Sequence, residues 1–132
     1  MPYGHRFRLW LLAPGCVKGK ASVRTVEFVD IYATLAERCR LDKPARLKGQ
    51  SLAPLLKQVN ARWDKAARTM VYHKDVLGKS VRTEHWRYTE WDGGKQGVEL
   101  YDHERDPGEY HNLARDPRQA ITLAEMKHLP RR

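Results

Sequence analysis

The sequence predicts an α/β chain in two parts, in which a strand and two helices precede a small antiparallel sheet and a closing helix. Three observations indicate this fold class. Residues 8–13 include an unbroken apolar run, which is typical of a strand buried on both faces of a parallel sheet. Apolar residues recur at helical spacing over residues 28–39. After residue 67, short segments rich in β-branched and aromatic side chains are separated by turn residues, as in antiparallel strands.

The first part is expected to hold the buried strand, a second short strand at residues 23–26 and two helices. The longer helix is amphipathic, with Asp30 and Thr34 on its polar side. Its apolar stripe is formed by Phe28, Ile31, Tyr32, Leu35, Ala36 and Cys39. Ser51 is placed to N-cap a short helix whose leucines at positions 52, 55 and 56 point inward.

The second part is expected to form four strands at residues 69–73, 79–83, 86–91 and 98–101, with a tight hairpin over residues 81–87. Strand alternation places Trp86 and Tyr88 on one face and Arg87 and Trp91 on the other. At least one aromatic pair should therefore lie in the core.

Turn and cap signals follow the sheet. Residues 106–109 predict a turn in which Gly108 takes a conformation that other residues resist, after which residues 112–113 dock against the sheet. Asp116 and Pro117 are typical of a helix start. The helix is predicted over residues 118–127, with Ile121, Leu123 and Met126 as its apolar members.

Composition excludes several classes of protein. The 132 residues carry 25 Lys and Arg against 16 Asp and Glu, a net charge of +9. Most of this excess lies within residues 1–66, but it is scattered, so a solvated face is favoured over a nucleic-acid arm. The longest apolar run is shorter than the roughly 20 residues of a membrane helix or the about 7–15 of a signal peptide. We therefore expect no membrane contact, and no export signal is read in this chain.

The chain offers no catalytic constellation. Its six histidines stand at none of the HExxH or CxxC spacings, and two cysteines cannot supply a four-ligand zinc site. His103, Glu104 and Asp106 would suit a cation, but a polar loop explains them equally well. We predict no catalytic residue and no metal ligand here.

Four stretches nevertheless occur in a recognisable order. They are Leu-Trp-Leu-Leu-Ala-Pro-Gly at 9–15, Val-Glu-Phe-Val-Asp-Ile-Tyr-Ala-Thr-Leu at 26–35, Gly-Gln-Ser-Leu-Ala-Pro-Leu-Leu at 49–56, and a compound pattern over 80–113 that includes Glu-Leu-Tyr-Asp and Asp-Pro-Gly-Glu. Together they resemble the C-terminal part of a type I, formylglycine-dependent sulfatase, most like the iduronate-2-sulfatase group. Arg8 and Ala33 depart from the family's usual prolines.

The resemblance implies an alkaline-phosphatase-like α/β fold, in which residues 1–66 end the large α/β domain and residues 67–132 form the small C-terminal subdomain. It implies a sulfuric ester hydrolase acting on sulfated sugars such as glycosaminoglycans, with calcium and formylglycine in the complete enzyme. Neither Cys16 nor Cys39 stands in the family's Cys-x-Pro/Ala-x-Arg motif, and its metal ligands lie N-terminal to the stretch near Arg8. This chain alone is expected to hold no cofactor and to be inactive.

Implied partners are a sulfated carbohydrate and a complementary N-terminal sulfatase chain. His73, Lys74 and Arg82 could face the substrate, although polar residues at strand ends are often only solvated. An alternative stays open: a non-catalytic basic module that binds nucleic acid or, preferably, an acidic glycan, for which the positive residues would have to converge on one face. Complete family members are often exported or lysosomal.

Overall fold

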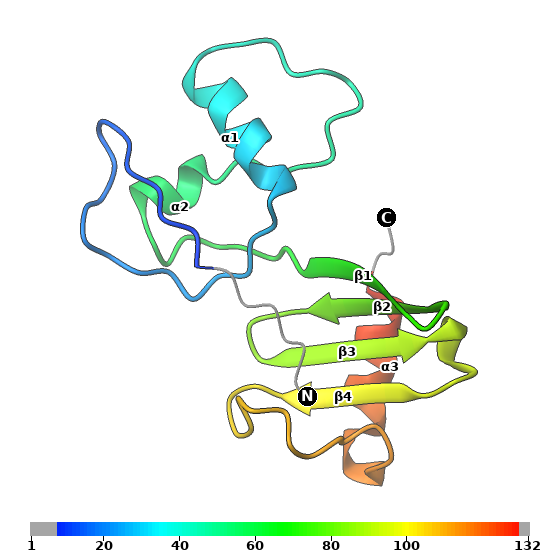
Figure 1. Ribbon diagram of the computed structural model, residues 1–132. Coiled ribbons are helices and arrows are strands. Elements are labelled where there is room, and N and C mark those ends of the chain that lie inside the picture. Colours follow the sequence, from blue (N-terminus) through cyan, green and yellow to red (C-terminus); the bar gives the residue numbers. More distant parts are fainter. Residues whose placement is uncertain (1–7, 130–132) are drawn as a thin grey trace. The chain divides into compact units, whose positions relative to one another are not determined.

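The computed structural model describes residues 8–129, which form two compact units that divide between Asp64 and Lys65. Each unit has its own core and is described by itself. The first contains two helices joined by long irregular segments, and the second contains a four-stranded sheet with a helix on one face (Figure 1).

The first unit holds α1 (Val29–Arg38) and α2 (Ala53–Lys57). Its core is formed by Leu52, Leu55 and Trp63, with Leu9 packed against them. The helices are where the sequence predicts them, and the inward leucines of α2 are confirmed at positions 52 and 55. The predicted N-cap at Ser51 is wrong, because Leu52 is the N-cap of α2 and no side chain caps this helix. The Ser51 hydroxyl lies one residue before the cap and accepts the N–H of Ala53 at 3.2 Å.

The strands predicted at residues 8–13 and 23–26 are wrong. Both segments are irregular, because a strand needs a hydrogen-bonded neighbour and the described part of this unit contains no strand. Trp10 and Leu12 are 87% and 84% exposed instead of buried.

The amphipathic pattern of α1 does not result in a buried apolar side. Its polar side is the buried one, with Asp30 and Thr34 only 0% and 4% exposed. Its apolar stripe is largely open to solvent, since Phe28, Tyr32 and Leu35 are all more than half exposed. The buried side is held by hydrogen bonds that are described below.

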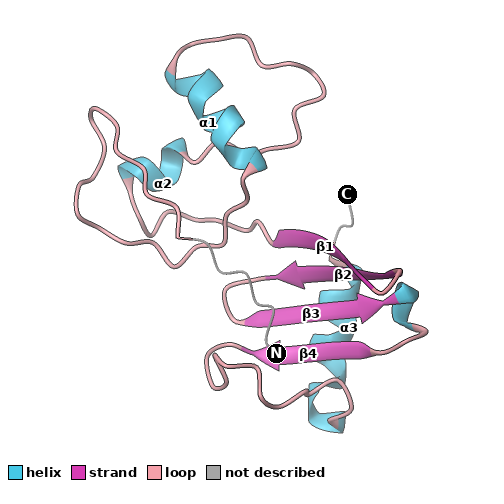
Figure 2. Cartoon of the chain, in the orientation of Figure 1, coloured by secondary structure: helices cyan, strands magenta, loops and turns pink. Residues whose placement is uncertain are grey.

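The second unit is an antiparallel sheet in the order β1-β2-β3-β4 (Figure 2). The strands are β1 (Ala67–His73), β2 (Val76–Arg82), β3 (Trp86–Trp91) and β4 (Val98–Asp102). The four predicted strands and the hairpin over residues 81–87 are confirmed, and Arg82 lies opposite Arg87. The β1–β2 turn uses Lys74 and Asp75 at positive φ, the pattern of a two-residue type I′ hairpin.

The helix α3 (Ala120–His128) covers one face of this sheet and follows a 3₁₀ turn at Pro117–Gln119. The core between them contains Ala66, Val81, Tyr88, Leu100 and Met126, with Trp86 and Leu123 packed against it. The predicted aromatic pair Trp86 and Tyr88 is therefore confirmed on the core face. Ile121 is not a core residue, because it is 77% exposed on the outer side of α3.

The side chain of Asp116 accepts the N–H of Arg118 at 3.0 Å, which confirms the predicted cap. Within residues 8–129, no helix has the length and apolar character needed to cross a membrane.

Candidate functional site

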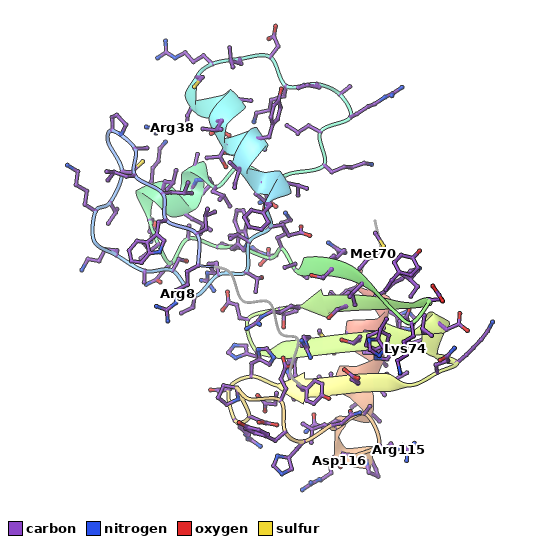
Figure 3. All side chains as sticks on the ribbon, viewed as in Figure 1. Arg8, Arg38, Met70, Lys74, Arg115 and Asp116 are labelled. Atoms are coloured by element: carbon purple, nitrogen blue, oxygen red, sulfur yellow. The ribbon has the colours of Figure 1, made fainter. Side chains whose placement is uncertain are left out.

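The three predicted substrate contacts lie at opposite ends of one hairpin. His73 and Lys74 are exposed at the tight turn between β1 and β2, where Figure 3 shows Lys74. Arg82 ends β2 and pairs in register with Ala67. Six residues of extended chain separate it from the turn, a distance of about 20 Å. The structure therefore brings His73 and Lys74 together but not Arg82.

Two polar side chains of α1, Asp30 and Thr34, hold another segment of the first unit in place, and we call this pair the polar pin. The carboxylate of Asp30 accepts the N–H of Glu27 and the N–H of Gln50, both at 2.9 Å. Thr34, one turn later, donates its hydroxyl to the Asp30 carbonyl at 2.6 Å and accepts the N–H of Leu52 at 2.9 Å. Two side chains of α1 thus fix a segment about twenty residues away.

The pin also explains the glycine and serine in that segment. A Cβ at Gly49 would overlap the carbonyl oxygen of Val29, so only glycine allows this approach. A hydrogen bond from the Ser51 hydroxyl holds the pKa of Glu37 below its ordinary value. Because Asp30 and Thr34 are both engaged in holding backbone groups, the arrangement is structural.

The turn at residues 106–109 anchors a second polar cluster. The N–H of Glu109 donates to the carbonyl of Asp106 at 3.1 Å, which confirms the turn. The expectation for Gly108 is wrong, because Glu109 is the residue at positive φ, 58°. A Cβ at position 108 would overlap the ring of Tyr110, so a larger residue there would require this exposed ring to move.

Glu109 buries its carboxylate between the guanidinium of Arg87 and the ring of His103. It forms an ion pair with Arg87 and contacts Nε2 of His103 at 2.5 Å, and the side chains of His103 and Glu109 are only 3% and 7% exposed. The Arg87 guanidinium lies 5.4 Å from the ring centroid of Tyr101. Burial raises the pKa of Tyr101 above its ordinary value.

Sequence reasoning missed this cluster. Strand alternation places Arg87 on the face opposite Tyr88, but it gives no indication of a partner for this arginine. A left-handed conformation at a glutamate costs about 1–3 kcal/mol and persists only where contacts enforce it. The ion pair of Glu109 supplies such contacts.

Asn112 closes the edge of β4 with its side-chain amide. Its Oδ1 accepts the N–H of Leu100 at 3.1 Å, and its Nδ2 donates to the carbonyl of Val98 at 3.1 Å. The next residue, Leu113, donates its N–H to the Leu100 carbonyl at 2.8 Å. The predicted docking of residues 112–113 against the sheet is confirmed.

An open hollow of about 600 Å³ lies beside this edge. It is bounded by the end of β3, the β3–β4 turn, the start of β4 and the segment before α3. Its lining residues are Trp91, Gln96, Gly97, Val98, Glu99, Asn112, Ala114 and Arg115.

The described residues do not fit calcium or formylglycine. Between residues 8 and 129, no three His, Cys, Asp or Glu side chains gather to hold a cation. Cys16 and Cys39 are free thiols outside the formylglycine motif. No reaction step is therefore derived through either group.

Known proteins share this fold. A curated Δ4,5-hexuronate-2-O-sulfatase of Bacteroides thetaiotaomicron is 34% identical over 106 residues, which span 76% of this chain and 22% of that protein. A solved structure of a 2-O GAG sulfatase is 34% identical with a TM-score of 0.61, covering 73% of this chain and 22% of that one. A phosphonate monoester hydrolase of Agrobacterium radiobacter is 25% identical with a TM-score of 0.57, over the same shares of the two chains.

The fold is therefore that of the C-terminal part of a sulfatase of the alkaline-phosphatase-like class. A family model described as N-sulphoglucosamine sulphohydrolase, C-terminal, matches residues 3–130, and the chain belongs to this family. The predicted resemblance to sulfatases is confirmed. The chain spans about a fifth of the length of the relatives that it matches.

Proposed function

We propose that this chain is the C-terminal portion of a sulfatase that hydrolyses sulfate esters of sulfated sugars, and that it has no such activity alone. The observation that carries the proposal is the family match over nearly the whole chain, combined with its coverage of only about a fifth of a Δ4,5-hexuronate-2-O-sulfatase. Sulfate ester hydrolysis requires a nucleophile and a polarising cation at one point. The described residues supply neither as a group.

The substrate class that the comparisons favour is a 2-O-sulfated uronate within a glycosaminoglycan. Two relatives at 34% identity are a hexuronate-2-O-sulfatase and a 2-O GAG sulfatase. The motif resemblance to the iduronate-2-sulfatase group points to the same position on the same type of sugar. Calcium and formylglycine would then belong to the N-terminal part of the enzyme.

The partner that we propose for the first unit is that N-terminal α/β part. The exposed stripe on α1 supports this, because large apolar side chains gathered on one helix face are typical of an interaction surface. In the assembled enzyme His73, Lys74 and Arg82 are proposed sugar contacts. Since about 20 Å separates the hairpin turn from Arg82, the two ends would meet different sugar units.

A chimera tests the proposal. The C-terminal part of the Bacteroides hexuronate-2-O-sulfatase is replaced by this chain, and hydrolysis of an unsaturated 2-O-sulfated disaccharide is compared with that of the truncated relative. We expect turnover by the chimera and none by the truncated relative or by this chain alone.

A second measurement covers the case in which the chimera does not fold. This chain is incubated with an aryl sulfate and excess calcium, beside a variant carrying Cys16→Ala and Cys39→Ala. Turnover above that variant would show that the chain carries its own nucleophile and would refute the proposed role. A soluble, folded chimera without turnover would refute it as well.

A further inference from the structure

We propose that the hollow at the β4 edge binds a sugar ring that carries one sulfate and no carboxylate, such as a sulfated hexosamine unit. The choice of a sulfated sugar as ligand rests on the proposed function. The hollow itself rests on the geometry of the second unit. Pockets of this size that combine an aromatic surface with a few polar groups are typical of small-molecule sites.

Trp91 provides a flat surface on one side of the hollow. Its ring lies against the backbone at Gly78, where an added Cβ would come within 2.6 Å of the ring. Its indole Nε1 donates to Oε1 of Glu99 at 3.1 Å, so the ring is fixed at both ends. A fixed, half-exposed indole suits the C–H face of a sugar ring, because its π face is electron-rich.

Arg115 provides the positive charge. It is exposed and has no hydrogen bond or ion pair with any other described residue. Its neighbour Asp116 is already occupied, because Arg118 donates to both carboxylate oxygens of Asp116 at 2.8–3.2 Å. Arg115 and Asp116 lie on the segment that precedes α3 (Figure 3). The Arg115 guanidinium is therefore available for an anion, and its planar donors suit the oxygens of a sulfate.

Glu99 sets the charge that the ligand can carry. Only one of its oxygens accepts the indole N–H, which leaves the other to accept hydrogen bonds from sugar hydroxyls. The same carboxylate repels a second anionic group on the ligand. A uronate that carries both carboxylate and sulfate should bind less well than a neutral ring with a single sulfate.

Equilibrium dialysis of the full chain tests this, since it tolerates self-association. The probes are N-acetylglucosamine 6-sulfate, unsulfated N-acetylglucosamine, inorganic sulfate and a 2-O-sulfated uronate monosaccharide. We expect the sulfated hexosamine to bind at least about fivefold more tightly than any of the other three.

Two substitutions place the binding in the hollow. Arg115→Gln should weaken the sulfated hexosamine about fivefold or more, whereas Arg105→Gln, which removes an exposed arginine outside the hollow, should change it less than about twofold. Glu99→Gln keeps an acceptor for the indole N–H. It should reduce the difference in affinity between the sulfated hexosamine and the sulfated uronate. Equal weakening by Arg115→Gln and Arg105→Gln, or equal binding of inorganic sulfate, would overturn the inference.

The outcome is separable from the proposed function. An active chimera together with no saccharide binding would remove the hollow as a site and leave the sulfatase role intact. Binding in the hollow together with an inactive, folded chimera would leave the hollow as a site and remove the sulfatase role.

Discussion

At the scale of single residues, hydrogen-bond demand decides which side of α1 is buried. Asp30 and Thr34 lie inside because backbone N–H groups of two other segments need acceptors there. Apolar spacing predicts the helix but not this orientation, since spacing carries no information about distant backbone donors. The polar side of α1 therefore has all of its partners within this unit, whereas its apolar stripe has few.

Removing the carboxylate of Asp30 should destabilise the first unit. Asp30→Ala leaves the N–H groups of Glu27 and Gln50 without their acceptor, at a cost of about 1–3 kcal/mol. Asp30→Asn keeps one acceptor and should lose less. Urea unfolding measures both against Asp42→Ala, an exposed loop position. Equal midpoints for Asp30→Ala and Asp42→Ala would contradict the pin.

Asp106 gives the second unit a dependence on acid pH. The N–H of His111 donates to Asp106 at 2.8 Å, and this bond holds the pKa of Asp106 below its ordinary value of 3.8. A carboxyl with a lowered folded pKa stabilises the fold at neutral pH, and that stability is lost as the pH falls below about 4. Asp106→Asn keeps the acceptor but does not titrate, so its unfolding midpoint should fall less between pH 5 and pH 3. Parallel pH profiles for the variant and the original chain would contradict this role.

At the scale of elements, local signals predict the second unit far better than the first. Hairpins depend on neighbouring residues, so alternation and turn chemistry identify all four strands of the sheet. A strand at residues 8–13 depends on partners distant in sequence, and a run of apolar residues cannot create them. For the same reason the sequence predicts the turn at residues 106–109 but not the ion pair that joins Glu109 to Arg87.

The β4 edge depends on one amide. Asn112→Ala removes the acceptor of the Leu100 N–H, and Leu100 is fully buried, so we expect a loss of about 1–3 kcal/mol. Asn112→Asp keeps the acceptor of the N–H groups of Leu100 and Ala114 but places a carboxylate oxygen beside the Val98 carbonyl. Because position 112 is exposed, water screens this repulsion, and aspartate should cost less than alanine. Chemical unfolding followed by near-ultraviolet circular dichroism would report the order. Alanine and aspartate variants of equal stability would show that the loop docks without this bond.

At the scale of the whole molecule, the exposed apolar residues concentrate in the first unit, in both its irregular segment and its longest helix. Those on α1 belong to the surface that we assign to the N-terminal part of a sulfatase. The apolar residues near position 10 are divided in a similar way, because Leu9 packs against the core while Trp10 and Leu12 are exposed. Each large apolar side chain left in water forgoes about 1.5–3 kcal/mol of burial, so several together favour association between copies.

Expressed by itself, the chain should therefore form oligomers or aggregates, and deleting residues 1–15 should increase its solubility. The double substitution Trp10→Gln and Leu12→Gln separates exposure from packing, because it keeps Leu9 in the core. It should shift the species seen by light scattering toward the monomer without lowering the unfolding midpoint. Leu9→Gln, the matched change at the partly buried neighbour, should lower the free energy of unfolding by about 1–3 kcal/mol and leave the association unchanged. A monodisperse monomer for the full chain, with no gain from either the deletion or the double substitution, would mean that these side chains are satisfied within the chain and need no partner.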